Sequence, residues 1–267
     1  MTDYCMENKE YWIAMKRRWT IITIVVILLT GCALVCFSFI SNPWNTKHVG
    51  DIPCPAGYSR LENGDSYTSF LRELPLKKRG ALVHLYTGGV ARLQFLSAGV
   101  VDMPVLSNSE QCADVAMRIR AEYLWKEGRY SEICFTSVGG KKQPYTGGNS
   151  REAFEKYMKA VYGVCNTASV YRETEVRALK DVQPGDVLVY PSRRKGAYGH
   201  AILVADVAKS QSGKLAILCI EGNTPAREAH VVRNPNPFRN PWFILKGDEK
   251  VIKVSVFRFN KEELRHY

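Results

Sequence analysis

The sequence lacks the usual motifs of a metal site. The cysteines after residue 43 include no C-x-x-C pair, and the five histidines form neither an H-E-x-x-H nor an H-x-H motif. Structural zinc sites use closely spaced cysteine and histidine ligands, and zinc hydrolases often pair two histidines on one helix. We therefore expect neither a metal ion nor another cofactor.

Internal repeats and low-complexity tracts are also absent from the sequence. The chain has 267 residues, of which 46% are hydrophobic and 24% are charged. This composition is typical of a globular protein with a sizeable core. Extensive disorder, a collagen-like fibre and a small disulfide scaffold are therefore excluded.

One apolar segment interrupts this ordinary composition, because residues 20–40 are 21 residues without a charged side chain. As a helix the segment is about 31 Å long, close to the thickness of a bilayer core. Lys16, Arg17 and Arg18 precede it, and basic flanks tend to stay in the cytoplasm. We expect residues 1–19 to be a cytoplasmic N-terminus or signal n-region. The rest of the chain is then a bacterial, membrane-anchored domain in the periplasm or on the cell surface.

Two interpretations of the apolar segment remain open. It can be an uncleaved signal anchor, for which its length is right. Alternatively, Leu29-Thr30-Gly31-Cys32 resembles a bacterial lipobox, in which Cys32 is lipidated after cleavage, and Met15 is then a second candidate for the start. Residues 33–40 stay apolar, whereas a mature lipoprotein usually turns polar after its cysteine. Both interpretations predict a tethered domain outside the cytoplasm.

The basic surplus belongs to the domain after the apolar segment. Residues 1–43 hold four basic and three acidic residues, so 33 Lys and Arg remain against 23 Asp and Glu. Such a surplus favours an anionic partner. We expect this partner to be peptidoglycan, another anionic envelope polymer or the membrane surface, and we expect no nucleic acid. The alternative is a solvated basic surface that binds nothing.

The pattern after residue 40 predicts a linker followed by one α+β domain. Prolines and glycines interrupt residues 41–57, and the domain covers residues 58–267. Helical periodicity precedes strand periodicity, which is typical of helices packed on an antiparallel sheet. The expected helices are residues 66–74, 108–125 and 150–161, and the expected strands are residues 81–86, 186–190, 200–207, 215–221, 229–232 and 251–259.

Cys112 has a special position among the cysteines. Ser107 and Glu110 form a capping box that predicts a helix over residues 108–125, so Cys112 falls in its first turns. The unpaired N–H groups at a helix start favour a thiolate, which makes Cys112 a candidate nucleophile. The alternative is that Cys112 is a small buried residue on the apolar stripe of the helix.

His200 opens a predicted strand directly after a glycine, where a substrate can approach its imidazole. If the next hairpin pairs Val207 with Lys214, His200 lies opposite Glu221; a register two residues longer brings Asn223 there instead. Either side chain can accept a proton from the imidazole and fix its tautomer. The alternative is that His200 is a structural histidine whose ring nitrogens are hydrogen-bonded at a strand end. Glu221 and Asn223 are then only polar residues at the end of a hairpin.

The order of these motifs resembles that of the papain-like amidases of the CHAP and NlpC/P60 group. A cysteine at a helix start is followed by PGDVLVY, GHAILVADV and IEGN. The resemblance implies a papain-like core over about residues 107–245 and a set of four catalytic residues. It assigns the nucleophile to Cys112, the base to His200, the orienting role to Glu221 and the final polar position to Asn223.

A closer resemblance covers the whole exported chain. The stretches SFLRELPL, QCAD and RIRAEYL and the PWF near the C-terminus resemble a family of exported bacterial proteins that carry only a domain of unknown function. That resemblance implies no activity.

Two classes of function follow from these patterns. The first is a cysteine amidase or peptidase acting on cell-wall peptide, with Arg193, Arg194 and Lys195 lining the approach to the site. The second is a non-catalytic binding or adaptor protein of the envelope, with residues 139–148 and 86–105 shaping its surface. The distance between the thiol and the imidazole separates them, because nucleophile and base need hydrogen-bond reach. An enzyme of another class, such as a lipid acyl transferase, is the third interpretation.

Overall fold

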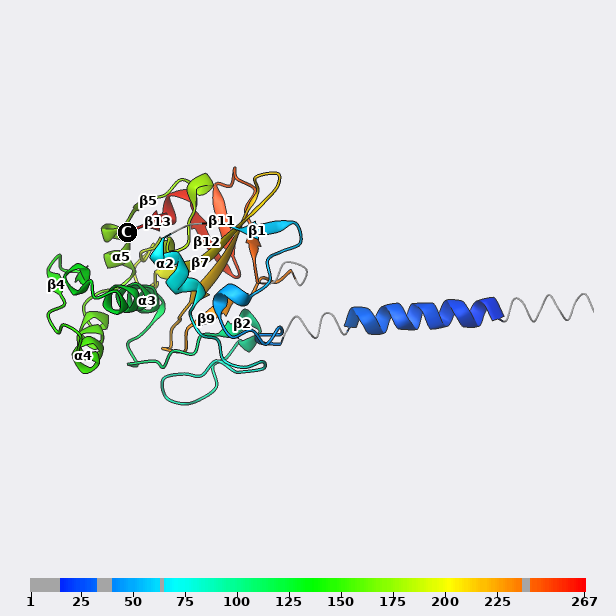
Figure 1. Cartoon of the computed structure of the whole chain (residues 1–267), viewed down its shortest axis with the longest axis horizontal. Helices are drawn as coiled ribbons and strands as arrows, with labels where there is room; N and C mark the ends of the chain where they lie inside the picture. The colour runs from blue at the N-terminus through cyan, green and yellow to red at the C-terminus, as the bar shows by residue number, and fades with distance from the viewer. Residues whose placement is uncertain (1–14, 33–39, 63–64, 237–240) are drawn as a thin grey trace, which may run out of the picture. The chain divides into compact units, whose positions relative to one another are not determined.

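The structure is a computed structural model that describes residues 15–32, 40–62, 65–236 and 241–267. Residues 15–32 form a helix, and residues 40–267 belong to a separate compact unit (Figure 1). The predicted apolar segment, residues 20–40, falls partly outside the described residues, as does most of the predicted cytoplasmic N-terminus. Within the described ranges, no helix is both long enough and apolar enough to cross a lipid bilayer.

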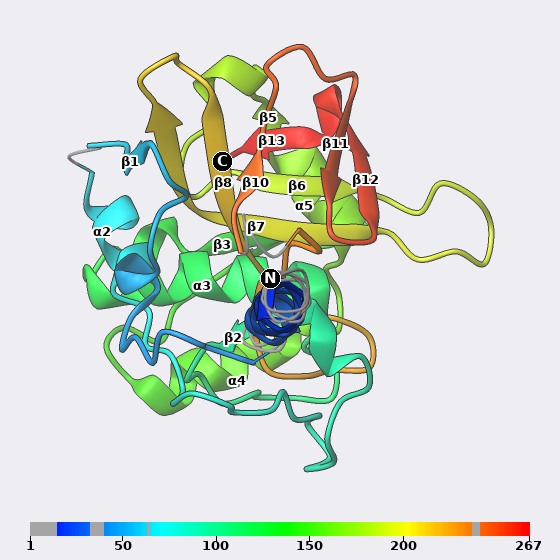
Figure 2. The same cartoon turned by 90° about the vertical axis from the view of Figure 1, so that its right-hand side faces the viewer.

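A nine-stranded sheet forms the centre of the compact unit (Figure 2). Its main path runs β2-β9-β8-β7-β6-β13-β5, while β1 pairs with β7 and β10 pairs with β8. These pairs are antiparallel, as expected from the sequence. The strands of the sheet are β1 (Tyr58–Arg60), β2 (Ser97–Val100), β5 (Glu175–Val176), β6 (Val187–Tyr190), β7 (His200–Ser210), β8 (Leu215–Glu221), β9 (His230–Val232), β10 (Phe243–Ile244) and β13 (Leu264–His266).

Three of the four helices described in the compact unit begin after a residue whose side chain caps them. The side chains of Asp65, Ser150 and Asn166 each accept a backbone N–H bond at a helix N-terminus, which satisfies a donor that the helix itself cannot pair. The helices are α2 (Ser66–Arg72), α3 (Cys112–Lys126), α4 (Arg151–Tyr162) and α5 (Thr167–Glu173).

The sheet separates two apolar cores. Alternate residues of its central strands point to opposite faces, so Leu203 and Ile220 contribute to one core while Ile202 and Cys219 contribute to the other. The first core packs against the helices, above all α3. The second core packs against a hairpin formed by β11 (Val251–Val254) and β12 (Phe257–Asn260). The molecule is therefore an α+β fold, with helices on one face of the sheet and a hairpin on the other.

The long strand β7 contains an irregularity that shifts its register. Near the turn, Val207 pairs with Ile217; beyond the break between Val204 and Asp206, Val204 pairs with Cys219. The predicted pairing of Val207 with Lys214 is therefore wrong. Beyond the bulge, where β7 has one residue that β8 does not match, the pairs follow the longer alternative, whose continuation brings Asn223 opposite His200.

Several predicted boundaries also change. Residues 41–57 are not a separate linker, because they belong to the compact unit and bury Val49 and Ile52 in its core. Residues 81–86 form isolated bridges instead of a strand. Residues 251–259 divide into β11 and β12, and a further small hairpin joins β3 (Cys134–Thr136) to β4 (Lys142–Pro144).

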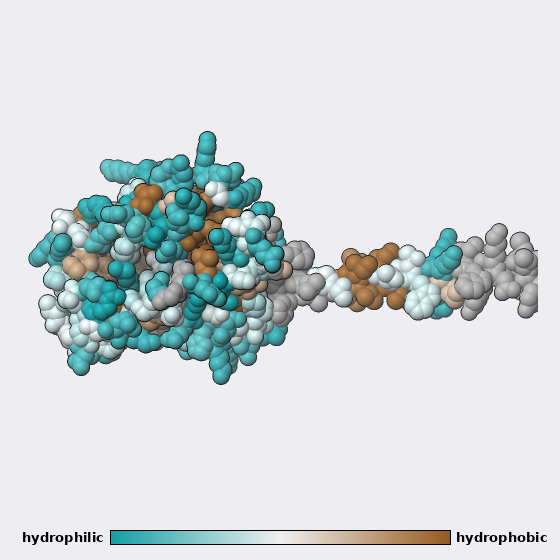
Figure 3. All heavy atoms as spheres, turned by 45° about the horizontal axis from the view of Figure 1, so that its top comes forward, coloured by the Kyte–Doolittle hydropathy of each residue, from teal (hydrophilic) through white to brown (hydrophobic). Residues whose placement is uncertain are grey.

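The surface of the compact unit is mostly hydrophilic on the face that Figure 3 shows, with only small groups of apolar side chains. This agrees with the basic surplus in the sequence. Most apolar side chains are accordingly buried in the two cores on either side of the sheet.

Candidate functional site

Cys112 is the first residue of α3. The helix does not begin at residue 108 as predicted, because Ser107 caps only a turn: its hydroxyl accepts from the backbone N–H of Ser109. The cap of α3 comes instead from Asp114, whose carboxylate accepts from the backbone N–H of Gln111 at 2.9 Å. The thiol therefore lies at the helix terminus itself, where backbone N–H groups are unpaired.

A buried ion pair holds the segment that leads to Cys112. Glu110 accepts from Arg118 at 2.8 Å and from the backbone N–H of Leu106 at 2.6 Å, while Arg118 also donates to the carbonyl of Pro104. Both charged side chains are almost fully buried. Sequence reasoning assigned Glu110 to a capping box, and its actual role is to fasten residues 104–110 onto α3.

His200 is the first residue of β7 and pairs with Tyr190 of β6. It is buried, and its ring stacks on Phe257 of β12 with centroids 3.6 Å apart. The imidazole lies close enough to Cys112 for the cysteine to raise its pKa. The start of β7 and the start of α3 thus bring together the two residues that the sequence analysis singled out as nucleophile and base.

Glu221, the last residue of β8, holds the other side of this imidazole. Its Oε2 lies 3.0 Å from Nε2 of His200, which leaves Nδ1 of the ring to face the thiol. Burial alone raises the pKa of Glu221, but hydrogen bonds from His200 and His230 outweigh burial and lower the pKa to about 2. The group is therefore a carboxylate at any physiological pH.

The same interactions act on His200 in the opposite direction. Burial alone lowers its pKa, but the hydrogen bonds to Cys112 and Glu221, together with their negative charges, raise the pKa to about 9. A histidine with this pKa is an imidazolium at neutral pH. The arrangement thus favours a proton on the ring and a negative charge beside it.

His230 is the member of this cluster that sequence reasoning missed. It pairs directly with Glu221 across β8 and β9, and its Nε2 lies 3.4 Å from Oε1 of Glu221. Its Nδ1 lies 3.0 Å from the carbonyl of Glu228. The predicted strand over residues 229–232 contained this histidine, but only the pairing of β8 with β9 shows that Glu221 lies between two imidazoles.

Two glycines allow the helices to approach these strand ends. A Cβ atom on Gly199 would lie 2.2 Å from the hydroxyl oxygen of Thr167 in α5, and one on Gly222 would lie 2.4 Å from a methyl carbon of Val115 in α3. Neither position has room for a side chain. These glycines stand next to His200 and Glu221 in the sequence, so the close approach of helix and sheet occurs at the site itself.

Cys112 lines a cavity of about 190 Å³ between the starts of α3 and α5 and the loop that joins β6 to β7. That loop contributes Ser192, Ala197, Tyr198 and Gly199 to the wall. Other lining residues are Gln111, Ala113, Asp114, Asn166, Thr167, Ala168 and Thr224. The thiol is thus buried by its neighbours yet borders a space that can admit a ligand.

The three basic residues predicted to line the approach do not line this cavity. Arg193 instead pairs with Glu263 at 2.6 Å and stacks on the ring of Tyr190. Arg194 and Lys195 lie exposed on the same loop. The loop itself borders the site as expected, but its small residues and Tyr198 face the cavity.

Asp114 adds a second titratable group to the cavity wall. Burial raises the pKa of its carboxyl to about 7, and its Oδ1 has no hydrogen-bond partner. Its Oδ2 is used by the α3 cap. The cavity therefore contains one carboxyl that changes charge near neutral pH.

Asn223 is not in hydrogen-bond contact with His200 among the residues the structure describes. Its side chain accepts from the backbone N–H of Thr224, and Thr224 donates through its hydroxyl to Gln111. The residue lies in the loop after β8 and contributes to a different, water-sized cavity beside Glu221 and His230.

The remaining site predictions concern Cys32 and metal ions. Cys32 is an exposed, free cysteine at the end of the helix over residues 15–32, and its lipidation stays a prediction. In the described part of the chain, no cluster of three or more histidine, cysteine or acidic side chains could hold a metal ion.

Comparison with known proteins identifies one family. No curated protein and no solved structure matches the chain, so neither kind of comparison supports the papain-like resemblance. Residues 50–147 and 145–266 both match the domain of unknown function DUF4846. These matches together span most of the compact unit and contain every residue of the Cys112, His200 and Glu221 cluster. The chain therefore belongs to the DUF4846 family.

Proposed function

We propose that this protein is a papain-like cysteine hydrolase that cleaves amide bonds in envelope peptides outside the cytoplasm. The observation that carries the proposal is the chain of contacts from Cys112 to His200 to Glu221, with the thiol bordering a cavity. Nucleophile, base and orienting group in this order are the parts of a cysteine hydrolase.

The reaction proceeds in two steps on these residues. The Cys112 thiolate attacks the amide carbonyl carbon, forming the C–S bond, and the imidazolium of His200 gives its proton to the leaving amine as the C–N bond breaks. A water molecule then loses a proton to His200 and attacks the thioester. The C–S bond breaks, the carboxylic acid leaves, and the thiolate and imidazolium are restored.

The start of α3 provides donors for the oxyanion of each step. The first N–H groups of a helix have no partner within it, and Cys112 and Ala113 both border the cavity. Gln111 borders it as well, and Thr224 holds its amide oxygen at 2.9 Å. That contact leaves the NH₂ of Gln111 as a further donor.

Peptides of an anionic wall polymer are the substrate class that fits the rest of the chain. The basic surplus after residue 43 attracts such a polymer, and the predicted tether keeps the domain beside it. The runner-up, a non-catalytic binding protein, is disfavoured by the interaction between Cys112 and His200, because a cleft that only binds a ligand needs no such pair.

The test compares two cysteine variants of the full chain. Purified Cys112→Ala is expected to lose hydrolysis of soluble muropeptides by about 10³-fold or more, with an unchanged melting temperature. Cys134→Ala, which removes a half-buried thiol from β3, is the control and keeps the activity. Hydrolysis that survives in Cys112→Ala, or a wild-type chain that cleaves no wall peptide and leaves Cys112 unlabelled by a peptidyl electrophile, contradicts the proposal.

A further inference from the structure

Large apolar side chains are exposed in one loop of the compact unit. Of the eleven such side chains that are exposed in its described residues, five lie in residues 82–95, which we call the apolar flap. About half of the surface of each is exposed to solvent. The five are Leu82, Tyr86, Val90, Leu93 and Phe95.

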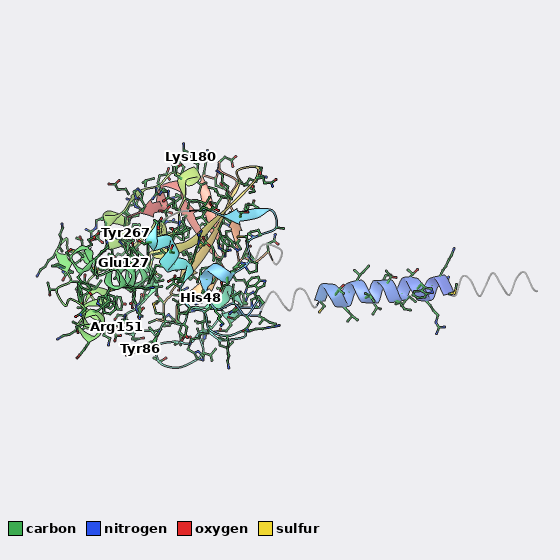
Figure 4. All side chains as sticks on the ribbon, viewed as in Figure 1. His48, Tyr86, Glu127, Arg151, Lys180 and Tyr267 are labelled. Atoms are coloured by element: carbon green, nitrogen blue, oxygen red, sulfur yellow. The ribbon has the colours of Figure 1, made fainter. Side chains whose placement is uncertain are left out.

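The flap is held in shape by its own polar contacts. The side chain of Gln94 accepts from the backbone N–H of Val83 and donates to the carbonyls of Val83 and Ala91. Val83 and Ala91 are buried in a small cluster with Val100. The inner face of the flap is therefore already packed, and the exposed apolar side chains form its outer face, with Tyr86 near its tip (Figure 4).

The stretch of chain that contains the flap is basic. Residues 74–101 contain four Lys and Arg and no Asp or Glu. Lys78, Arg79 and Arg92 are exposed in this stretch. Lys77 pairs with Glu228, whose carboxylate also accepts from the backbone N–H of His84. An apolar face with a basic margin suits the boundary between acyl chains and anionic headgroups.

The base of the flap is bonded to the first residues of the compact unit. The backbone N–H of Gly80 donates to the carbonyl of Ser41, and the side chain of Asn42 donates to the carbonyl of Lys77. Residue 41 follows directly on the apolar run that the sequence analysis assigns to the membrane. A tethered chain therefore keeps the flap close to the lipid surface.

The flap does not belong to the wall of the Cys112 cavity, because none of its residues lines that cavity. Several of its residues, Leu93 among them, border instead the water-sized cavity beside Glu221 and His230. This placement argues against a contact with substrate at the thiol. We propose that the apolar flap is a membrane-contact surface that inserts its outer side chains among anionic lipids. The inference does not depend on the proposed hydrolase activity.

The test places a photoreactive group on the flap of the full chain. Phe95 is replaced by p-benzoylphenylalanine, and Tyr198, which is exposed on the β6–β7 loop, is replaced in the same way as the control. After illumination in vesicles that contain phosphatidylglycerol, lipid adducts are counted by mass spectrometry. We expect at least about tenfold more lipid adduct at position 95 than at position 198.

The second part of the experiment changes the charge of the lipids and of the basic residues near the flap. Replacing phosphatidylglycerol by phosphatidylcholine, or combining Lys78→Glu with Arg92→Glu, is expected to lower the adduct at position 95 about threefold or more. Equal adducts at the two positions overturn the proposal. A crosslink from position 95 to a second protein chain, or a full chain that does not float with the vesicles, overturns it as well.

Discussion

Strand β7 carries two buried charged groups that differ in how many charged or polar partners surround them. Asp206 is fully buried, and its oxygens accept from Arg60 at 2.6 Å, from Arg72 at 2.8 Å and from the backbone N–H of Val207 at 2.9 Å. His200, at the start of the same strand, contacts one carboxylate and one thiol, and the thiol borders a cavity.

The difference lies in how completely each centre is paired. Each oxygen of Asp206 has its donors, and the centre ties β1 and α2 to the sheet. The centre around His200 includes a thiol that borders a cavity, and the neighbouring Asp114 has an oxygen without a hydrogen-bond partner. Incomplete pairing inside a folded protein is costly and is therefore a pointer to function.

The largest effect is expected from Asp206→Ala. This change leaves Arg60 and Arg72 without their buried partner, so we expect unfolding in denaturant to show a loss of about 3 kcal/mol. The rate of hydrolysis per folded molecule should stay unchanged. A variant that folds normally but loses activity would show that the Asp206 centre is not purely structural.

Glu221→Gln tests the other centre and is expected to act mainly on rate. The amide keeps the shape of the side chain but removes the charge that stabilises the imidazolium, so kcat/KM should fall about 100-fold. Thermal unfolding, measured in parallel, should change less than in Asp206→Ala. If Glu221→Gln destabilises the protein more than it slows the reaction, the two centres have the same role.

Gly222→Ala addresses the approach of α3 to the sheet. The added methyl group would overlap Val115, so the start of α3 must shift, and we expect kcat/KM to fall about tenfold. Gly139→Ala, at a position where the added methyl group would make only an ordinary contact with the Ser137 hydroxyl, is the matched control. Equal activity of the two variants would indicate that the position of the Cys112 helix is not critical.

The smallest effect concerns pH. Because the folded pKa of His200 is raised to about 9, above its ordinary 6.5, its stabilising contribution is complete below pH 6.5 and is lost as the pH rises through 9. Activity is expected to fall over the same alkaline range. Glu221→Gln should lower the pH at which activity falls by about one unit, and His230→Gln should lower it by less. Profiles of kcat/KM from pH 5 to 10 measure this midpoint for each variant. An unchanged midpoint in Glu221→Gln contradicts the prediction.

Much of the fold follows from local sequence. Strand β8 has the predicted bounds, and α4 is predicted to within a residue because its apolar stripe and the Ser150 cap agree. Helix α5 was missed, since its seven residues are too few to show a clear period and its start depends on the Asn166 cap.

The geometry of the site was less accessible to sequence reasoning. Cys112, His200 and Glu221 could be selected from their positions at element ends. The contact of Glu221 with His230 could not, because it depends on how β9, which follows β8 after a loop, pairs with that strand. The position of His230 became clear only from the pairing of β8 with β9. The role of Glu110 became clear only from its contacts with Leu106 and Arg118.

The two glycines at the strand ends also connect the site to contacts between segments far apart in the sequence. Gly222 accommodates Val115, which comes from the other half of the chain, and Gly199 accommodates Thr167. Contacts of this kind carry a larger loop-closure cost than contacts within one helix or hairpin. Cys112 at the start of α3 and His200 at the start of β7 therefore come together through tertiary packing, and neither element alone creates the pair.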